Sequence, residues 1–183
     1  ATDRSVHALG TAAAFPVRDD ARPWRVVSSA AMVQGQGLRR ESYFYEGAKW
    51  HAQGRGFLGF ARRTAHDQDG GLTRVEDYLQ DPLAYDRIGA LSLLTLKQRT
   101  RGPVAITNYN WSRRTFGSGY EARSLPFVAS TTMDRYELDG MQVLRSAEYN
   151  TFDAFGTLVR RQVNTSEIGK GLTPGALYTE ITT

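Results

Sequence analysis

The chain of 183 residues contains no cysteine, and this absence excludes several classes of site. Without thiols there is no disulfide, no cysteine nucleophile, no cysteine-ligated zinc and no iron–sulfur centre. Cysteine usage therefore does not indicate the redox compartment of the protein. Long apolar runs are also missing: Ala12–Val17 and Ala90–Leu96 are far shorter than the roughly 20 residues that a transmembrane helix needs. We expect no membrane span and no signal peptide.

Histidine is scarce, and its positions argue against a metal centre. His7, His51 and His66 lie in separate segments without a ligand-type neighbour at metal-site spacing. The stretch His66–Gly70 has the alternating carboxylates of a calcium loop fragment, but it has no third loop carboxylate, and Glu76 is too near to close the loop. A hairpin turn is the favoured interpretation, and we predict no metal site.

Lysine is almost absent, so that the basic charge is carried by arginine. Basic minus acidic residues gives 23 − 19 = +4, and the excess lies in residues 1–66, which hold 10 basic and 5 acidic residues. Arginine stacks on aromatic rings and pairs with carboxylates, which suits an aromatic-rich sheet, although codon bias of a GC-rich genome gives the same composition. A nucleic-acid binder shows a denser basic stripe, so we predict no nucleic-acid partner.

Motifs for catalysis and cofactors are weak. The acid pairs Glu76-Asp77 and Asp81/Asp86 have the residue types of a glycosidase, but acids in turns are usually solvated. Ser118, between two glycines, is not in a nucleophile-elbow context. The string Gly54–Gly59 matches a GxGxxG pattern yet leads into an arginine-rich strand, not a helix. We therefore predict no catalytic residues, no cofactor-binding residues and no cofactor.

Short β-prone runs separated by glycine turns fill the sequence, and no stretch keeps helical periodicity for three turns. This pattern predicts an all-β fold of long antiparallel β-hairpins in an extended curved sheet with a thin core. We predict a loop at residues 80–87, between two of these strands. The predicted strands are Trp24–Val33, Leu38–Glu46, Phe57–His66, Leu72–Leu79, Leu91–Arg101, Val104–Phe116, Phe127–Leu138, Met141–Thr151 and Leu158–Thr165. The predicted turns are Gln34–Gly37, Asp69–Gly71, Arg101–Pro103, Asp139-Gly140 and Phe155-Gly156.

An internal repeat lies near the C-terminal end, with one copy beginning at Tyr136 and the next at Phe152. Tyr136–Arg145 aligns with Phe152–Arg161, so that an aromatic residue, a glycine, a valine and an arginine coincide. The physical unit of this Tyr136/Phe152 repeat is a strand, a glycine turn and a further strand, with the leading aromatic packing across the hairpin. One such unit cannot bury its own face and must stack on the next.

These residues carry a family resemblance. Tyr149–Leu158 looks like the tyrosine–aspartate (YD) repeat of the RHS family. The segments Tyr43–Gly47, Gly54–Phe60 and Thr73–Gln80 resemble the part that precedes or opens the RHS shell in SpvB-like proteins and in the B component of insecticidal toxin complexes. The resemblance covers roughly residues 24–168.

The resemblance implies a function that composition does not show. RHS proteins build β-hairpins into a hollow shell, and in toxin-complex B components the shell encloses a cytotoxic domain. Nothing in the chain matches the family's autoproteolytic site or its upstream propeller. We therefore expect a non-enzymatic wall segment of a secreted or cell-surface bacterial protein, whose partner is an enclosed toxin domain or an associated protein. Because the sequence begins at Ala1, we expect a processed or excised piece of a longer polypeptide.

The expected organisation has three parts: an irregular segment 1–23, the hairpin region 24–168 and a tail 169–183. Two other functions stay open. One is a β-sheet module that binds a glycan or a protein through exposed aromatic and arginine side chains. The other is a hydrolase whose carboxylates converge only in the fold. The aromatic residues considered for such a platform are Tyr43, Phe44, Tyr45, Tyr109 and Trp111, for which cross-strand stacking is the favoured role.

Overall fold

The computed structural model describes residues 5–11, 13–34, 37–82, 84–99, 101–168 and 175–182. Most of the described residues are in strands, and helix is limited there to short 3₁₀ segments, which confirms the predicted all-β fold with an extended antiparallel sheet. The chain divides into two compact units, Ala1–Thr100 and Arg101–Thr183. Among the described residues, no helix is long and apolar enough to cross a membrane.

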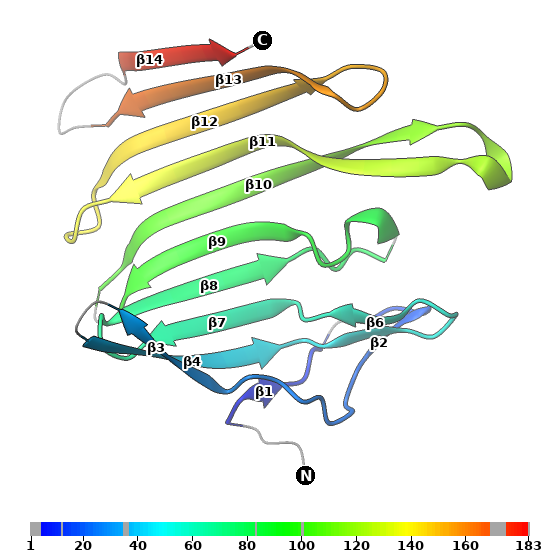
Figure 1. Cartoon of the computed structure of the whole chain (residues 1–183), viewed down its shortest axis with the longest axis horizontal. Helices are drawn as coiled ribbons and strands as arrows, with labels where there is room; N and C mark the ends of the chain where they lie inside the picture. Colours follow the sequence, from blue (N-terminus) through cyan, green and yellow to red (C-terminus); the bar gives the residue numbers. More distant parts are fainter. Residues whose placement is uncertain are drawn as a thin grey trace. The chain divides into compact units, whose positions relative to one another are not determined.

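The first unit contains a main sheet and a small one (Figure 1). The main sheet has the order β1-β4-β7-β8-β9, and β3 also pairs with β4. Its neighbouring strands are antiparallel, except that β1 is parallel to β4. The strands of the main sheet are β1 (His7–Ala8), β3 (Ser29–Gln34), β4 (Gly37–Glu46), β7 (Arg62–Asp67), β8 (Leu72–Tyr78) and β9 (Leu91–Gln98). The small sheet is β2 (Val17–Asp19), β5 (Lys49–His51) and β6 (Gly56–Gly59).

The second unit is an antiparallel meander in which each strand pairs with the next along the chain (Figure 1). Its strands are β10 (Pro103–Phe116), β11 (Arg123–Tyr136), β12 (Gln142–Phe152), β13 (Leu158–Glu167) and β14 (Gly175–Thr182). Two single-turn 3₁₀ helices lie in loops: η1 (Tyr85–Arg87) follows β8 and η2 (Gly119–Glu121) follows β10.

The predicted strands correspond to observed ones with two corrections. Trp24–Val33 forms a strand only from Ser29 onward, because Trp24 is held by a side-chain hydrogen bond to Asp20 and by ring contact with Phe57. Phe57–His66 is two strands, β6 and β7. Gly59, the last residue of β6, has φ +97°. Two residues later, the Ala61 amide donates to the Glu46 carbonyl of β4, so the chain passes from the small sheet to the main sheet between β6 and β7.

Some strands and turns lie outside the predictions. Strands β1, β2 and β14 fall in the segments 1–23 and 169–183, and β5 was also not predicted. The three-part division itself remains a prediction. Of the predicted turn Gln34–Gly37, positions 35 and 36 lie outside the described residues, although β3 and β4 pair in antiparallel register on either side.

The apolar core is thin. Among the described residues, the buried hydrophobic side chains are Val17, Ala48, Ala65 and Ala84. Buried polar and charged residues outnumber them: His7, Asp20, Glu41, Lys49, His51, Thr73, Glu76 and Asp134. Backbone ladders and ion pairs on the sheet faces therefore provide stabilisation that a larger domain draws from packed aliphatic side chains.

The Tyr136/Phe152 repeat predicted from the sequence corresponds to a repeated backbone geometry. In the first copy the Glu137 amide donates to the Met141 carbonyl over 2.8 Å, and in the second copy the Asp153 amide donates to the Thr157 carbonyl over 2.9 Å. The β11–β12 register shifts between positions 135 and 136, and the β12–β13 register shifts between 151 and 152. The same bulge and turn thus recur at the two ends of β12.

Both turns of the repeat require a glycine. Gly140 has φ +89° and Gly156 has φ +86°, in the region that L side chains rarely adopt. We expect Gly140→Ala and Gly156→Ala each to lower the free energy of unfolding by about 1–2 kcal/mol. Denaturant unfolding followed by circular dichroism measures the loss. Gly102→Ala is the control, because a Cβ at Gly102 meets open space without a positive φ; an equal loss in all three variants would contradict the argument.

Candidate functional site

The three histidines lie on three strands and serve separate local contacts. The His7 ring on β1 packs edge-on against Phe60 at 5.9 Å between centroids, and the His51 ring on β5 packs edge-on against Tyr85 at 5.1 Å. His66 on β7 is hydrogen bonded to Thr73. Across the described ranges, no group of three or more His, Cys, Asp or Glu residues is arranged to hold a metal ion.

The calcium-loop fragment forms the β7–β8 hairpin turn. Asp67 Oδ1 accepts hydrogen bonds from the backbone amides of Asp69 and Gly70 at 3.1 and 2.8 Å. The Asp69 carboxylate in turn accepts hydrogen bonds from the backbone and the guanidinium of Arg40. These contacts lower the pKa of the Asp69 carboxyl, the backbone hydrogen bond from Arg40 being the main cause. Both carboxylates therefore stabilise the turn.

Within the described part of the chain, the candidate acids Glu76 and Asp77 do not converge on one cleft. Glu76 and Asp77 are adjacent on β8 and point to opposite faces of the sheet, where each binds an arginine, Arg63 and Arg62 respectively. Asp86 lies 4.0 Å from the Arg87 guanidinium. The Gly54–Gly59 string contains strand β6 and is followed by the arginine-bearing strand β7, so it is not followed by a helix N-terminus for a phosphate. Ser118 is the residue before the 3₁₀ helix η2 and makes no side-chain cap there.

One face of the main sheet carries a charge ladder that the sequence analysis missed. The ladder is built from a repeated Arg-x-Glu-x-Tyr pattern on β4 and β8, on either side of β7. On β8, Glu76 accepts hydrogen bonds from Arg63 of β7 at 2.5 Å and from the Tyr78 hydroxyl at 2.8 Å, and Arg74 lies 3.3 Å away. On β4, the corresponding residues are Arg39, Glu41 and Tyr43, and Arg39 also pairs with Asp67.

Electrostatics within the ladder follow from burial and pairing. Burial alone raises the pKa of the Glu76 carboxyl, but the hydrogen bonds from Arg63 and Tyr78 together with the arginine charges outweigh it, so this pKa lies below its ordinary value. Burial and the hydrogen bond to Glu76 raise the pKa of Tyr78 to about 12. The carboxylate is thus held ionised and the phenol neutral, which is a structural arrangement and not that of a poised acid–base pair.

The aromatic residues considered for a binding platform, for which cross-strand stacking is the favoured role, do not all share one face of β4. Tyr43 and Tyr45 share one face of β4, and Phe44 is on the other. Tyr45 stacks on Phe60 with ring centroids 4.9 Å apart. Tyr109 and Trp111 are on β10, which belongs to the second unit.

A different aromatic cluster, which the sequence analysis also missed, surrounds the Gly54–Phe60 segment. Trp24 packs on Phe57 at 4.3 Å, and Phe57 packs edge-on against Phe60 at 5.5 Å. The glycine-rich signature is the signal that marks this place in the sequence, because Gly54, Gly56 and Gly59 all adopt positive φ around Phe57. The cluster joins the segment before β3 to strand β6.

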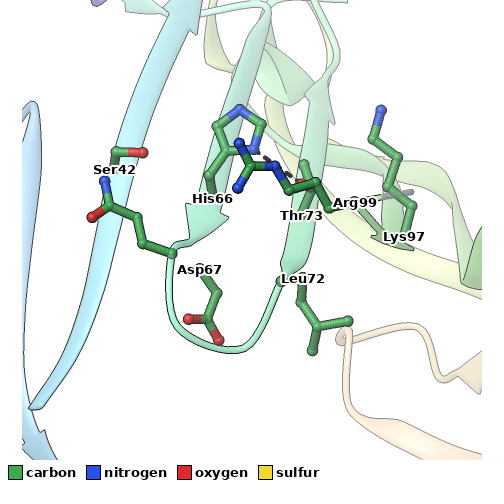
Figure 2. Close-up of a pocket in the computed structure, with 9 residues that line it drawn as sticks. Ser42, His66, Asp67, Leu72, Thr73, Lys97 and Arg99 are labelled. Carbon is green, nitrogen blue, oxygen red and sulfur yellow. Dashed lines mark hydrogen bonds between the residues drawn. The ribbon is translucent and has the colours of Figure 1, made fainter. Parts of the chain in front are cut away.

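A partly enclosed hollow of about 510 Å³ lies beside the β7–β8 hairpin (Figure 2). By strand register, its residues Ser42, His66 and Thr73 are on the face of the main sheet opposite to the ladder. A cross-strand row crosses its floor, since Ser42, His66, Thr73 and Lys97 are register partners on β4, β7, β8 and β9. The His66 ring Nδ1 lies 3.0 Å from the hydroxyl of Thr73, which is 4% exposed. Arg99, Gln68, Leu72, Gly71 and Asp67 complete the lining.

Comparisons with known proteins place the fold among toxin-complex structures. The fold is similar to chains of the crystal structure of TcdB2-TccC3, with TM-score 0.59 and 13% identity over 77% of this chain, and of the same complex without its hypervariable C-terminal region, with TM-score 0.58 and 12% identity over 77%. It is also similar to the Photorhabdus luminescens Tc holotoxin pore carrying a TccC3 variant, with TM-score 0.59 and 11% identity over 83%. This chain spans about 10% of each of those chains.

No protein-family model matches the sequence. No curated protein matches it significantly.

Proposed function

We propose that this chain is a non-enzymatic wall segment of an RHS-type β-shell, in a secreted or cell-surface bacterial protein, and that the shell encloses or carries a toxin polypeptide. The observation that carries the proposal is the fold likeness to chains of Tc toxin complexes at TM-scores of 0.58 and 0.59. A structural toxin-complex segment is the role that this likeness supports.

The architecture supports the same role. Strands β10 to β14 form an uninterrupted antiparallel meander, and the same hairpin turn recurs at the two ends of β12. A meander grows by adding strands at its edge without needing a central core, which suits a wall. The thin apolar core and the ion-paired faces fit this role too.

Enclosure by the shell is tested by measuring whether the enclosed polypeptide is protected from a protease. The test uses the natural polypeptide that contains this sequence, and compares Ser146→Pro with Leu138→Pro. Ser146 is paired on both sides, to Met133 of β11 and Thr165 of β13, so a proline there breaks the sheet. Leu138 is the second residue of a β-turn closed by the hydrogen bond from the Gly140 amide to Glu137, where proline is tolerated.

We expect the wild type and Leu138→Pro to protect the enclosed polypeptide from trypsin, and Ser146→Pro to expose it. Electron cryo-microscopy of the same wild-type preparation is expected to show a hollow particle with this sheet in its wall. A solid particle, or equal digestion of the polypeptide in all three proteins, would overturn the proposal. Binding of a glycan to such a preparation with no internal cavity would favour the alternative of a β-sheet binding module.

A further inference from the structure

Two basic side chains that line the hollow on the main sheet differ from the arginines of the surrounding strands in their ion pairing. Every arginine of β4, β7 and β8 forms an ion pair: Arg39, Arg40, Arg62, Arg63 and Arg74. Lys97 and Arg99, in contrast, have no carboxylate partner within the described ranges of the chain. Lys97 is on β9 and Arg99 is in the turn that follows it, and both side chains line the hollow. Two unneutralised positive charges therefore border one cavity.

Neutral hydrogen-bond donors accompany these cations. The hydroxyls of Ser42 and Thr73, the Gln68 amide and the His66 ring also line the hollow. When Thr73 donates to His66 Nδ1, the ring proton is on Nε2 and is available to a ligand. The donors come from four strands, from the turn after β7 and from the turn after β9, and all of them line the one hollow (Figure 2).

The one carboxylate in the lining is already neutralised. Asp67 Oδ1 accepts the amides of Asp69 and Gly70, and Oδ2 lies 3.3 Å from the Arg39 guanidinium. Figure 2 shows the Asp67 carboxylate pointing away from His66 and Arg99. It therefore does not cancel the positive potential of the hollow.

The position of Arg99 is fixed by the backbone. Its amide donates to the Gly71 carbonyl over 2.8 Å, which ties the residue after β9 to the β7–β8 turn. Thr73 is fixed by burial and by its contact with His66. The backbone of Arg99 and the Thr73–His66 pair are thus in place before a ligand arrives, which reduces part of the ordering cost of binding.

We propose that this hollow binds an oxyanion group, a phosphate or a sulfate, with Lys97 and Arg99 as the charged ligands and with Thr73 and His66 as hydrogen-bonding ligands. A tetrahedral anion has several acceptor oxygens and suits a hollow lined by donors from several strands, and arginine and lysine are the side chains that recognise such groups. The cavity volume lies in the range of small-molecule sites, so the group can belong to an ester as well as to a free anion.

Binding is measured on the whole chain by isothermal titration and by amide NMR shifts, at constant ionic strength. The probes are inorganic phosphate, glucose 6-phosphate and glucose. We expect both phosphate probes to bind and to shift the amides of residues 66–73 and 97–99, and glucose alone not to bind. Tighter binding of glucose 6-phosphate assigns the hollow to a phosphate ester, and equal binding assigns it to the free anion.

Charge-removing variants distinguish a site from general attraction to a basic protein. We expect Lys97→Gln and Arg99→Gln each to raise the Kd about tenfold, since each removes a charge-assisted hydrogen bond. The matched control is Arg123→Gln at an exposed position of β11, which removes the same charge from the chain and is expected to change the Kd less than twofold. The proposal is overturned if neither phosphate probe binds, or if the control weakens binding as much as the hollow variants do. Unchanged amide spectra outside the hollow establish that each variant folds, independently of whether the chain belongs to a shell.

Discussion

Replacing Glu76 by alanine is expected to lower the free energy of unfolding by about 3 kcal/mol. Glu76 is 8% exposed, accepts hydrogen bonds from Arg63 and Tyr78, and is ion-paired with Arg74. Its removal leaves two arginines and a phenol on this face without that acceptor, while the alanine returns little apolar contact. Denaturant unfolding and amide hydrogen exchange of β7 and β8 measure the loss.

Two further variants separate this effect from a general change of charge. Glu76→Gln keeps the shape of the side chain and one acceptor oxygen, so we expect a smaller loss than for alanine. Glu121→Ala removes a carboxylate from an exposed position of η2. Its free energy of unfolding is expected to stay within about 0.5 kcal/mol of the wild type, as for most surface substitutions. Equal losses for Glu76→Ala and Glu121→Ala would show that the ladder contributes nothing specific.

The ladder also predicts a dependence on pH at both extremes. The pKa of Glu76 is lower in the folded chain than in the unfolded one, so its contribution is present above the ordinary glutamate pKa and is lost as the pH falls through the folded value. The pKa of Tyr78 is raised to about 12, so its contribution is present below its ordinary pKa of 10.0 and is lost as the pH rises toward 12.

Replacing Asp20 by asparagine is expected to lower the free energy of unfolding by about 2 kcal/mol at neutral pH, because it removes charge-assisted hydrogen bonds. The Asp20 side chain is 3% exposed and accepts hydrogen bonds from the Arg22 guanidinium at 2.7 and 2.8 Å and from Trp24 Nε1 at 2.9 Å. Arg22 in turn lies 3.7 Å above the Trp50 ring. One carboxylate thus fixes the chain entering β3 against the small sheet.

The pH dependence of this loss has a defined sign. The side-chain hydrogen bond from Arg22 is the main cause that lowers the pKa of Asp20 from 3.8 to about 2, against the opposing effect of burial. A lowered folded pKa contributes stability above the unfolded pKa, and this stability disappears as the pH falls through 2. The difference between wild type and Asp20→Asn, measured by denaturant unfolding at several pH values, is therefore expected to be full above pH 4 and to shrink below it. A difference that stays constant down to pH 2 would contradict the assignment.

The sequence predicts the local features of the fold well, because glycine turns are encoded locally. Gly71, Gly140 and Gly156 all adopt positive φ at or beside hairpin turns where the sequence predicts them, and most long strands begin and end within a few residues of their predicted bounds. The short strands β1, β2 and β5 could not be predicted, since two or three residues carry no periodicity and pair with distant segments.

The charge ladder and the hollow could not be predicted from the sequence for a related reason. The Arg63–Glu76 pair joins residues 13 apart, and the hollow brings Ser42 next to His66, so both depend on strand register. The Arg-x-Glu-x-Tyr pattern on β4 and β8 was readable in principle, because residues two apart share a face. Only the pairing of both strands with β7 turns that pattern into a ladder.

The repeated bulge and turn at the two ends of β12 impose a parity rule on changes in chain length. Each copy of the Tyr136/Phe152 repeat carries the chain once across the sheet and reverses its direction, while it widens the sheet by about 4.8 Å. Insertion of a single unit would leave the chain at the opposite end of the strands, so that every downstream strand would run in the reverse direction. Insertion of two units would return the chain to the end of the strands at which it leaves the sheet without an insertion. Growth or shortening of such a meander is therefore expected to proceed in even numbers of units.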